Sequence, residues 1–214
     1  FDYYQVNVVA GQTIVVRTQA ANDIDVYLQM GQQPILTYLA NEIRLGDRIT
    51  PSSLVTALDV EGLGLDTVVP GATAAGSPPI VLNTWIADDL DARPGDVVTL
   101  QYYLWEEAGA LLTREAEFQV AAVVPLEGLA ADQDLAPEYP GITEATDVSD
   151  WDPPFPIDLD LVRQKDEEYW DEYRTVAKGF IGLADGQNLW RSRWGQVTSL
   201  RVAPLDGVSE AGTN

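Results

Sequence analysis

The amino-acid sequence predicts an α+β fold: a mixed, largely antiparallel β-sheet with two or three helices and a long ordered covering loop. The first observation behind this prediction is that apolar residues recur mostly in short runs bounded by turn formers, which is typical of strands. The second is that only a few stretches have the spacing of an amphipathic helix. The third is a long stretch, 126–160, that is rich in turn formers yet carries aromatic residues that need burial.

Composition restricts the chemistry open to this chain of 214 residues, which is long enough to bury a core in one domain or two small ones. Its 34 acidic and 12 basic side chains give a formal charge of −22, so polyphosphates and anionic membrane surfaces are repelled. The absence of cysteine and histidine excludes thiol nucleophiles, Ser-His-Asp catalysis and most transition-metal sites. Carboxylate pairs, Lys or Tyr bases and hard cations such as Ca²⁺ remain.

The first 34 residues are expected to form a β-hairpin or meander region. "YYQVNVVAGQTIVVRTQ" predicts a strand, an Ala-Gly-Gln turn and a second strand, and "DIDVYLQ" predicts a third. Residues 1–29 superficially resemble bacterial pre-peptidase C-terminal domains, which are β-sandwiches. The chain starts within a predicted strand, which is typical of an excised domain.

The next segment combines an ambiguous element with a clear one. Apolar residues at 35, 36, 39 and 43 predict a short helix, although the β-propensity of the first half leaves a strand open. Residues 52–60 predict a buried strand, and the Gly- and Pro-rich stretch 61–79 predicts a surface loop.

The clearest unit spans residues 80–124. It predicts a strand (80–83), a helix (84–92), a turn (93–96) and two antiparallel strands joined by a hairpin. Thr84 is expected to cap the helix, with Asp88 and Asp89 in its early turns.

The last part of the chain is expected to contain a helix over 159–175. Its predicted inward face consists of Leu159, Val162, Tyr169, Trp170 and Tyr173. A strand, a short helix from about Asp185 and a terminal strand follow, and residues 205–214 are expected to be a tail or linker.

Acidic residues gather in the stretch "DWDPPFPIDLDLVRQKDEEYWDEYR", which makes a cation site one interpretation. Its candidate Ca²⁺ ligands are Asp150, Asp152, Asp158 and Asp160. These residues lack EF-hand spacing, so the sequence favours capping of turns and helices and ion pairs with Arg163, Lys165 or Arg174. No catalytic residue and no cofactor site is predicted.

A locally basic stretch, "GQNLWRSRWG", gives the candidate partner-binding residues Trp190, Arg191, Arg193 and Trp194. The alternative, which the sequence favours, is internal docking against the acidic stretch of the same chain. The six tryptophans could also stack on sugars, but a glycosidase needs two carboxylates at a fixed separation, which abundance does not supply.

Several stretches together resemble the extracytoplasmic (periplasmic) core domain of FtsX/MacB-like ABC transporter permeases. "IVLNTWIADDLDARPGDVVTLQYYL" and then "FQVAAVVPLEG" are similar to the family's "N.W.A..L.A.PGD.V.L" and "F.V.AVVP" segments. "LTYLANEIRLGDRITPSSLVTALD", the acidic-aromatic segment 132–174 and "KGFIGLADGQNLWRSRWGQVTSLR" are similar to one bacterial branch of the group. The resemblance covers residues 35–202, whereas residues 1–29 match the family pattern poorly.

The resemblance implies a domain organisation and a function. Residues 35–204 would be a permease-type core domain on the periplasmic or extracellular face of the membrane, anchored through flanking helices absent from this sequence. It would be non-enzymatic and would transmit motion driven by ATP hydrolysis on a separate subunit or domain. Expected partners are another permease subunit, a cytoplasmic ABC ATPase and an extracytoplasmic protein, and no nucleic acid. The alternatives are a secreted carbohydrate-binding or Ca²⁺-stabilised β-rich module and a carboxylate-dependent hydrolase.

Overall fold

The computed structural model describes residues 13–14, 32–59, 76–105, 109–190 and 196–202. Within these ranges the strands are β1 (Thr13–Ile14), β2 (Gln32–Leu45), β3 (Arg48–Leu58), β4 (Pro79–Asn83), β5 (Val97–Trp105), β6 (Leu111–Val124), β7 (Gly179–Gly182) and β8 (Ser199–Val202). The α-helices are α1 (Thr84–Leu90), α2 (Gln164–Tyr173) and α3 (Leu183–Leu189). Short 3-10 turns are η2 (Gly128–Ala131), η3 (Gln133–Leu135), η4 (Val148–Asp150) and η5 (Leu159–Leu161).

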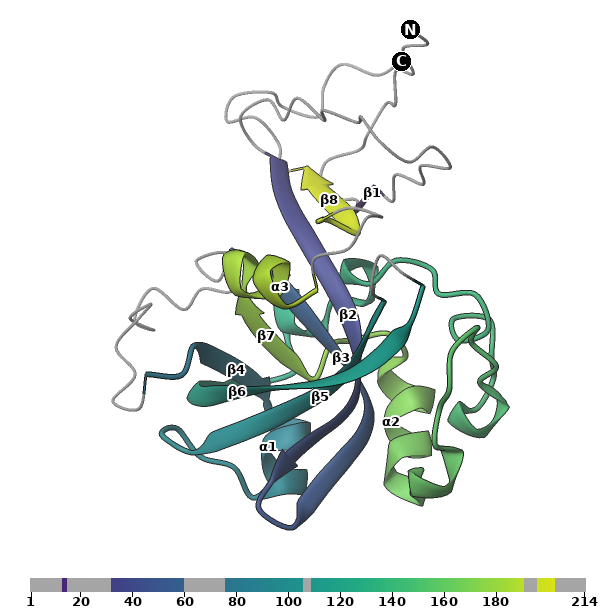
Figure 1. Cartoon of the computed structure of the whole chain (residues 1–214), viewed down its shortest axis with the longest axis horizontal. Coiled ribbons are helices and arrows are strands. Elements are labelled where there is room, and N and C mark those ends of the chain that lie inside the picture. The colour runs from purple at the N-terminus through teal and green to yellow at the C-terminus, as the bar shows by residue number, and fades with distance from the viewer. Residues whose placement is uncertain (1–12, 15–31, 60–75, 106–108, 191–195, 203–214) are drawn as a thin grey trace, which may run out of the picture.

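Six of the described strands close into a barrel. Their order is β2–β3–β7–β4–β6–β5, and pairing of β5 with β2 completes the ring (Figure 1). The pairs β3–β7 and β4–β6 are parallel, and the other pairs around the ring are antiparallel. The predicted α+β fold with a mixed, largely antiparallel sheet is confirmed, whereas its closure was not predicted.

Strands β2, β3, β4 and β7 bury both of their faces, which explains why several of them are nearly continuous apolar runs. One set of alternating side chains fills a cluster to which all six barrel strands contribute, for example Val55, Ile80 and Phe118. The opposite faces of β2, β3 and β4 join a second cluster, which includes Leu54 and Val81. Burial on two sides requires a second layer outside the barrel.

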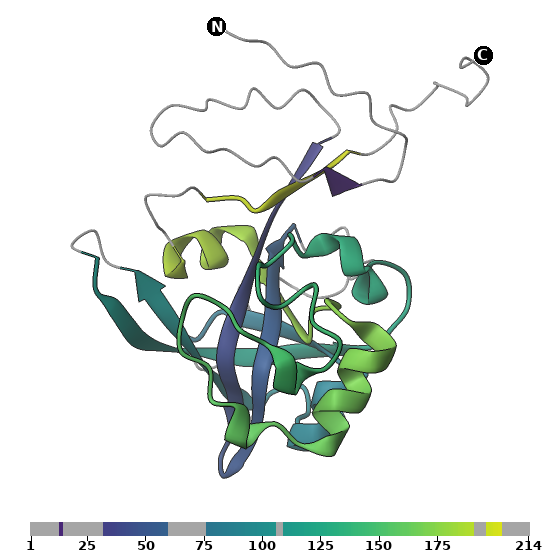
Figure 2. The same cartoon turned by 90° about the vertical axis from the view of Figure 1, so that its right-hand side faces the viewer.

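That outer layer is the covering segment, residues 126–163, together with α2. Figure 2 shows it lying in front of the barrel strands β2 and β3. Trp151 and Trp170 pack edge to face within the second cluster. The Tyr139 hydroxyl donates to the Thr37 carbonyl oxygen at 2.6 Å, and Thr37 Oγ1 donates to the Leu135 carbonyl oxygen at 2.8 Å. The predicted long, ordered loop over the sheet is therefore present and anchored to β2.

The long strand β2 extends beyond the barrel. Its residues from Leu36 onward pair with β3, whereas Gln32–Ile35 pair with β8, which in turn pairs with β1 (Figure 1). The antiparallel register sets Gln32 opposite Val202. The first residue of β2 and the last residue of β8 therefore lie side by side.

Three local predictions need correction. Residues 35–45 are strand rather than helix, because the cross-strand partners of β2 on both sides outweigh its helical apolar spacing. Asn83, not Thr84, caps α1, since its side chain accepts a hydrogen bond from the Ile86 amide. The helix expected over 159–175 divides into η5 and α2, and the 3-10 turn is capped by Asp158.

The unit 80–124 otherwise follows the prediction, including the hairpin of β5 and β6. The strand predicted over 52–60 forms within β3, and the strand before α3 and the terminal strand also form. Of the N-terminal region expected over 1–34, Thr13–Ile14 and residues 32–34 are described, and both are strand; residues 1–12 and 15–31 lie outside the described residues, as do 60–75 and 203–214. No helix in the described ranges is long and apolar enough to cross a membrane.

Candidate functional site

The candidate Ca²⁺ ligands do not come together. Asp150, Asp152, Asp158 and Asp160 are all exposed, and the described part of the chain has no group of three or more acidic residues placed to hold a metal ion. Asp158 accepts a hydrogen bond from the Asp160 amide and so caps η5, as the capping interpretation expected. The expected partners of these acids are engaged elsewhere, as the contacts of Arg163, Lys165 and Arg174 below show.

Trp190 is a core residue and not part of an exposed patch. Its side chain is 2% exposed and stacks on Tyr38 with ring centroids 4.9 Å apart. Tyr102 meets the same indole edge to face. Arg191, Arg193 and Trp194, the other candidate partner-binding residues, lie outside the described residues. Helical spacing alone cannot tell a tryptophan that closes a core from one that faces a partner.

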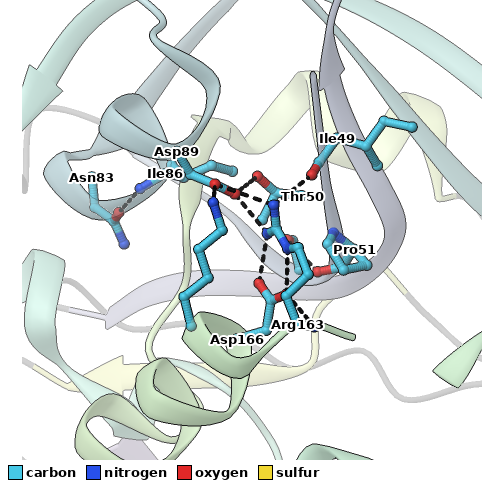
Figure 3. Close-up of polar contacts among 10 residues, drawn as sticks. Ile49, Thr50, Pro51, Asn83, Ile86, Asp89, Arg163 and Asp166 are labelled. Carbon is cyan, nitrogen blue, oxygen red and sulfur yellow. Dashed lines mark hydrogen bonds and ion pairs between the residues drawn. The ribbon is translucent and has the colours of Figure 1, made fainter. Parts of the chain in front are cut away.

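The main polar centre is instead a cluster of Thr50, Asp89, Arg163, Lys165 and Asp166, named here the Asp89 cluster (Figure 3). Its residues come from β3, α1, α2 and the residue that caps α2. The Asp89 carboxylate is 2% exposed and accepts hydrogen bonds from Thr50 Oγ1 at 2.6 Å, from both terminal nitrogens of Arg163, and from Lys165. This arrangement joins three elements that are distant in sequence.

Arg163 bridges two buried carboxylates through its planar guanidinium group. Nη2 lies 2.7 Å from Asp89 Oδ2 and 2.8 Å from Asp166 Oδ1, and Nε lies 2.7 Å from Asp166 Oδ2. Asp166 also accepts from the Arg163 amide at 2.9 Å, which caps the start of α2. A further bond from Arg163 Nη1 to the Ile49 carbonyl oxygen, at 3.1 Å, fixes the β2–β3 hairpin to the same group.

Hydrogen bonds shift the pKa values of Asp89 and Arg163. Burial alone would raise the pKa of Asp89, but hydrogen bonds from Arg163, Lys165 and Thr50 outweigh burial and hold that pKa below its ordinary value. Burial alone would lower the pKa of Arg163, but Asp166 and Asp89 raise it. Asp89 and Arg163 therefore face each other as a charged pair at neutral pH.

Lys178 lies beside this cluster and is the unusual group of the region. Its side chain is buried, and its ammonium lies 4.6 Å from the ring centroid of Trp85 and 4.8 Å from that of Tyr169. Burial lowers the pKa of Lys178 to about 8, although Asp166 and Asp89 partly oppose the shift. Two aromatic faces stabilise the cation without neutralising it.

A small pocket opens next to Lys178, between β3, the covering segment and α2. Its volume of about 20 Å³ is enough for a water molecule or a group of similar size. Charged residues in its wall are Asp166, Arg174 and Lys178, and the aromatic ones are Trp151, Tyr169 and Trp170. The Arg174 guanidinium lies over the Trp170 ring and donates to the Thr146 carbonyl oxygen.

A scan against protein-family models and a search of curated proteins found no match to this chain.

The sequence carried little sign of this centre. Asp89 and Arg163 are separated by 74 positions, and no spacing rule connects them. Lys178 left one usable signal, because it stands in "VAKGFIG" among small and apolar residues that otherwise predict a buried strand. A lysine in such a run is expected to be buried with an altered pKa.

Proposed function

We propose that this chain is a non-enzymatic extracytoplasmic module of an FtsX/MacB-like ABC transporter permease, which binds a partner and transmits ATP-driven motion across the membrane. The segments that resemble this family are the starting point, and they span the elements from β2 to β8. ATP hydrolysis would take place on a cytoplasmic ATPase. The module would work with that ATPase, with another permease subunit and with an extracytoplasmic protein.

The pairing of β2 with β8 is the observation that carries the proposal. Gln32 and Val202 are cross-strand neighbours, so the chain enters and leaves the barrel at one place. A domain inserted between two membrane helices needs this proximity, because both of its connections must return to the same membrane surface. The placement therefore supports an inserted module.

The strand β2 supports a mechanical role. It has 14 residues, and at about 3.3 Å per residue it measures about 45 Å, from the β8 pairing to the far end of the barrel. Within the barrel it is bonded to β3 on one side and to β5 on the other. Displacement applied near Gln32 would therefore reach the whole barrel.

The Asp89 cluster supports the same role, because it fixes the outer layer to the barrel. Arg163 stands where the covering segment meets α2, and its bonds reach α1 and the β2–β3 hairpin. Barrel and outer layer would then move as one unit, as transmission of motion requires. The carboxylates of the cluster would serve this fixation through their bonds to Arg163.

The parent gene provides the direct test. The proposal expects one membrane-spanning helix upstream of this segment, three downstream of it, and a neighbouring gene for an ABC ATPase. A parent protein that is a secreted multidomain chain would overturn the proposal. A secreted carbohydrate-binding module, by contrast, would show binding on a glycan array.

A further inference from the structure

One hydrogen-bond donor in the wall of the pocket beside Lys178 lacks an acceptor among the described residues. Trp151 lines the pocket and is 5% exposed, and its Nε1 is buried with no hydrogen-bond partner among the described residues. An indole N–H can only donate, and a buried donor without an acceptor costs about 1–3 kcal/mol. An acceptor atom that reached Trp151 Nε1 would remove this cost.

The charges of the wall point to an anionic acceptor. Lys178 and Arg174 form no ion pair with a carboxylate among the described residues, and both line the pocket. Asp166, the acid in the same wall, has both of its oxygens bonded to Arg163. The wall therefore carries two cations and one acid that is already paired with Arg163. An anion in the pocket would compensate the buried charge of Lys178.

The backbone at the pocket is also unusual. Ser52 lines it with φ 45°, a left-handed conformation that a residue with a side chain rarely adopts. Such conformations cluster at ligand sites, where the surrounding structure enforces them. Here the neighbouring strand residues Pro51 and Ser53 keep their partners on β2, so the register between β2 and β3 is interrupted at Ser52.

We propose that this pocket binds a single carboxylate group, with Lys178 supplying the opposite charge beside the Trp151 indole in the pocket wall. The volume of the pocket is sufficient for one such group. The formal charge of −22 on the whole chain further excludes polyanions, because only the local positive charge is attractive. This inference is independent of the permease proposal, since it depends on the pocket alone.

The carboxylate could belong to a free small acid or to the carboxyl end of a peptide. The pocket would recognise the carboxylate group in the same way in both. A water molecule could fill the pocket but would leave the Lys178 charge uncompensated. A water-filled pocket is therefore the competing outcome that the experiment must separate from the proposal.

The experiment follows the six tryptophan indole N–H signals by ¹⁵N-edited NMR during titration with sodium acetate, with sodium chloride at equal ionic strength as control. Acetate should shift the Trp151 signal saturably, and chloride should not. N-acetylglycine and its amide then distinguish the sources: a response to N-acetylglycine but not to the amide shows that a peptide carboxyl end fits, and a response to acetate alone shows a small acid.

Two variants complete the test. Lys178→Met should weaken acetate binding about tenfold or more, since a hydrogen bond to a charged group is lost. Trp105→Phe, at an exposed tryptophan outside the pocket, should leave binding unchanged. If Lys178→Met does not fold, saturating acetate should still raise the pKa of Lys178 measured in the unmodified chain. An absent or non-saturating shift of Trp151, or an equal shift with chloride, would overturn the proposal.

Discussion

Asp89→Asn is the substitution that most sharply tests whether the Asp89 cluster fixes the outer layer to the barrel. The change keeps the size of the side chain but removes the charge that Arg163 and Lys165 share. It also replaces one acceptor oxygen by an NH₂ donor, which then faces donors. The expected result is a lower free energy of unfolding with the barrel intact.

The magnitude follows from the exposure of the partners. Removing one member of a fully buried ion pair costs about 3–5 kcal/mol. Arg163 and Lys165 are 34% and 46% exposed, so both can regain water and the cost is smaller. Arg163 also keeps Asp166. We therefore expect about 2–3 kcal/mol, which corresponds to a fall in Tm of about 4–10 °C for a domain of this size.

Urea denaturation followed by tryptophan fluorescence measures this loss. The matched control is Asp88→Asn, at the exposed neighbouring position, which should change stability by about 0.5 kcal/mol or less. A double-mutant cycle of Asp89→Asn with Arg163→Gln should give a coupling energy of about 1 kcal/mol or more. Equal stability of the two asparagine variants, or a coupling energy near zero, would refute the role assigned to the cluster.

The same carboxylate has a defined pH dependence. Because its folded-state pKa is lowered, Asp89 contributes its full stability above the ordinary aspartate pKa of about 4, and this contribution is lost as the pH falls through the folded-state value. Acidification from about pH 5 to 3 should therefore cost the unmodified chain more stability than it costs Asp89→Asn. Parallel losses in the two proteins would show that Asp89 is not held in its ionised form.

Three further predictions concern Lys178, the covering segment and the core. Because burial lowers the folded-state pKa of Lys178 to about 8, the unfolded chain binds more protons above that pH; stability should rise by about 1–2 kcal/mol from about pH 8 to 9.5, and Lys178→Met should abolish the rise in urea titrations. Gly141 and Gly128 both have positive φ, but a Cβ would overlap the Asp152 carbonyl only at Gly141; Gly141→Ala should therefore lower Tm more than Gly128→Ala, and equal effects would contradict this. Trp190→Ala should cost about 3–5 kcal/mol in chemical denaturation, against about 1 or less for Trp105→Ala, which is 46% exposed; a neutral Trp190→Ala would show that the indole is not a core residue.

Local patterns in the sequence predicted most elements of the fold. The unit from Ile80 to Val124 has a helix stop at "RPGD" and alternating strands, so its order could be worked out from neighbouring residues alone. The segment 35–45 could not, because its apolar spacing suits a helix and only pairing with β3 and β5 makes it a strand. Closure of the barrel depends on that long-range β2–β5 pairing, which no local pattern encodes.

The candidate site was less accessible to sequence for a related reason. The abundance of Asp in 150–160 drew attention to residues that prove exposed, whereas Asp89 and Asp166 are the acids with buried side chains in the described ion pairs. Their importance depends on Arg163, which reaches Asp89 only after the outer layer has docked. Composition gives the number of charges in a chain, whereas burial determines which of them contribute strongly to its stability.

The most direct test of the account is a distance measurement on the longer membrane protein that the proposal expects, reconstituted in lipid together with the expected ATPase. Spin labels at exposed Glu117 and Ser149 would report on the barrel and the covering segment, and a third label would be placed in the expected membrane helix. The account predicts that ATP changes the distance from Glu117 to the membrane label while the Glu117–Ser149 distance stays constant. Failure of any ATPase to co-purify, an unchanged first distance during ATP hydrolysis, or a changed second distance would contradict it.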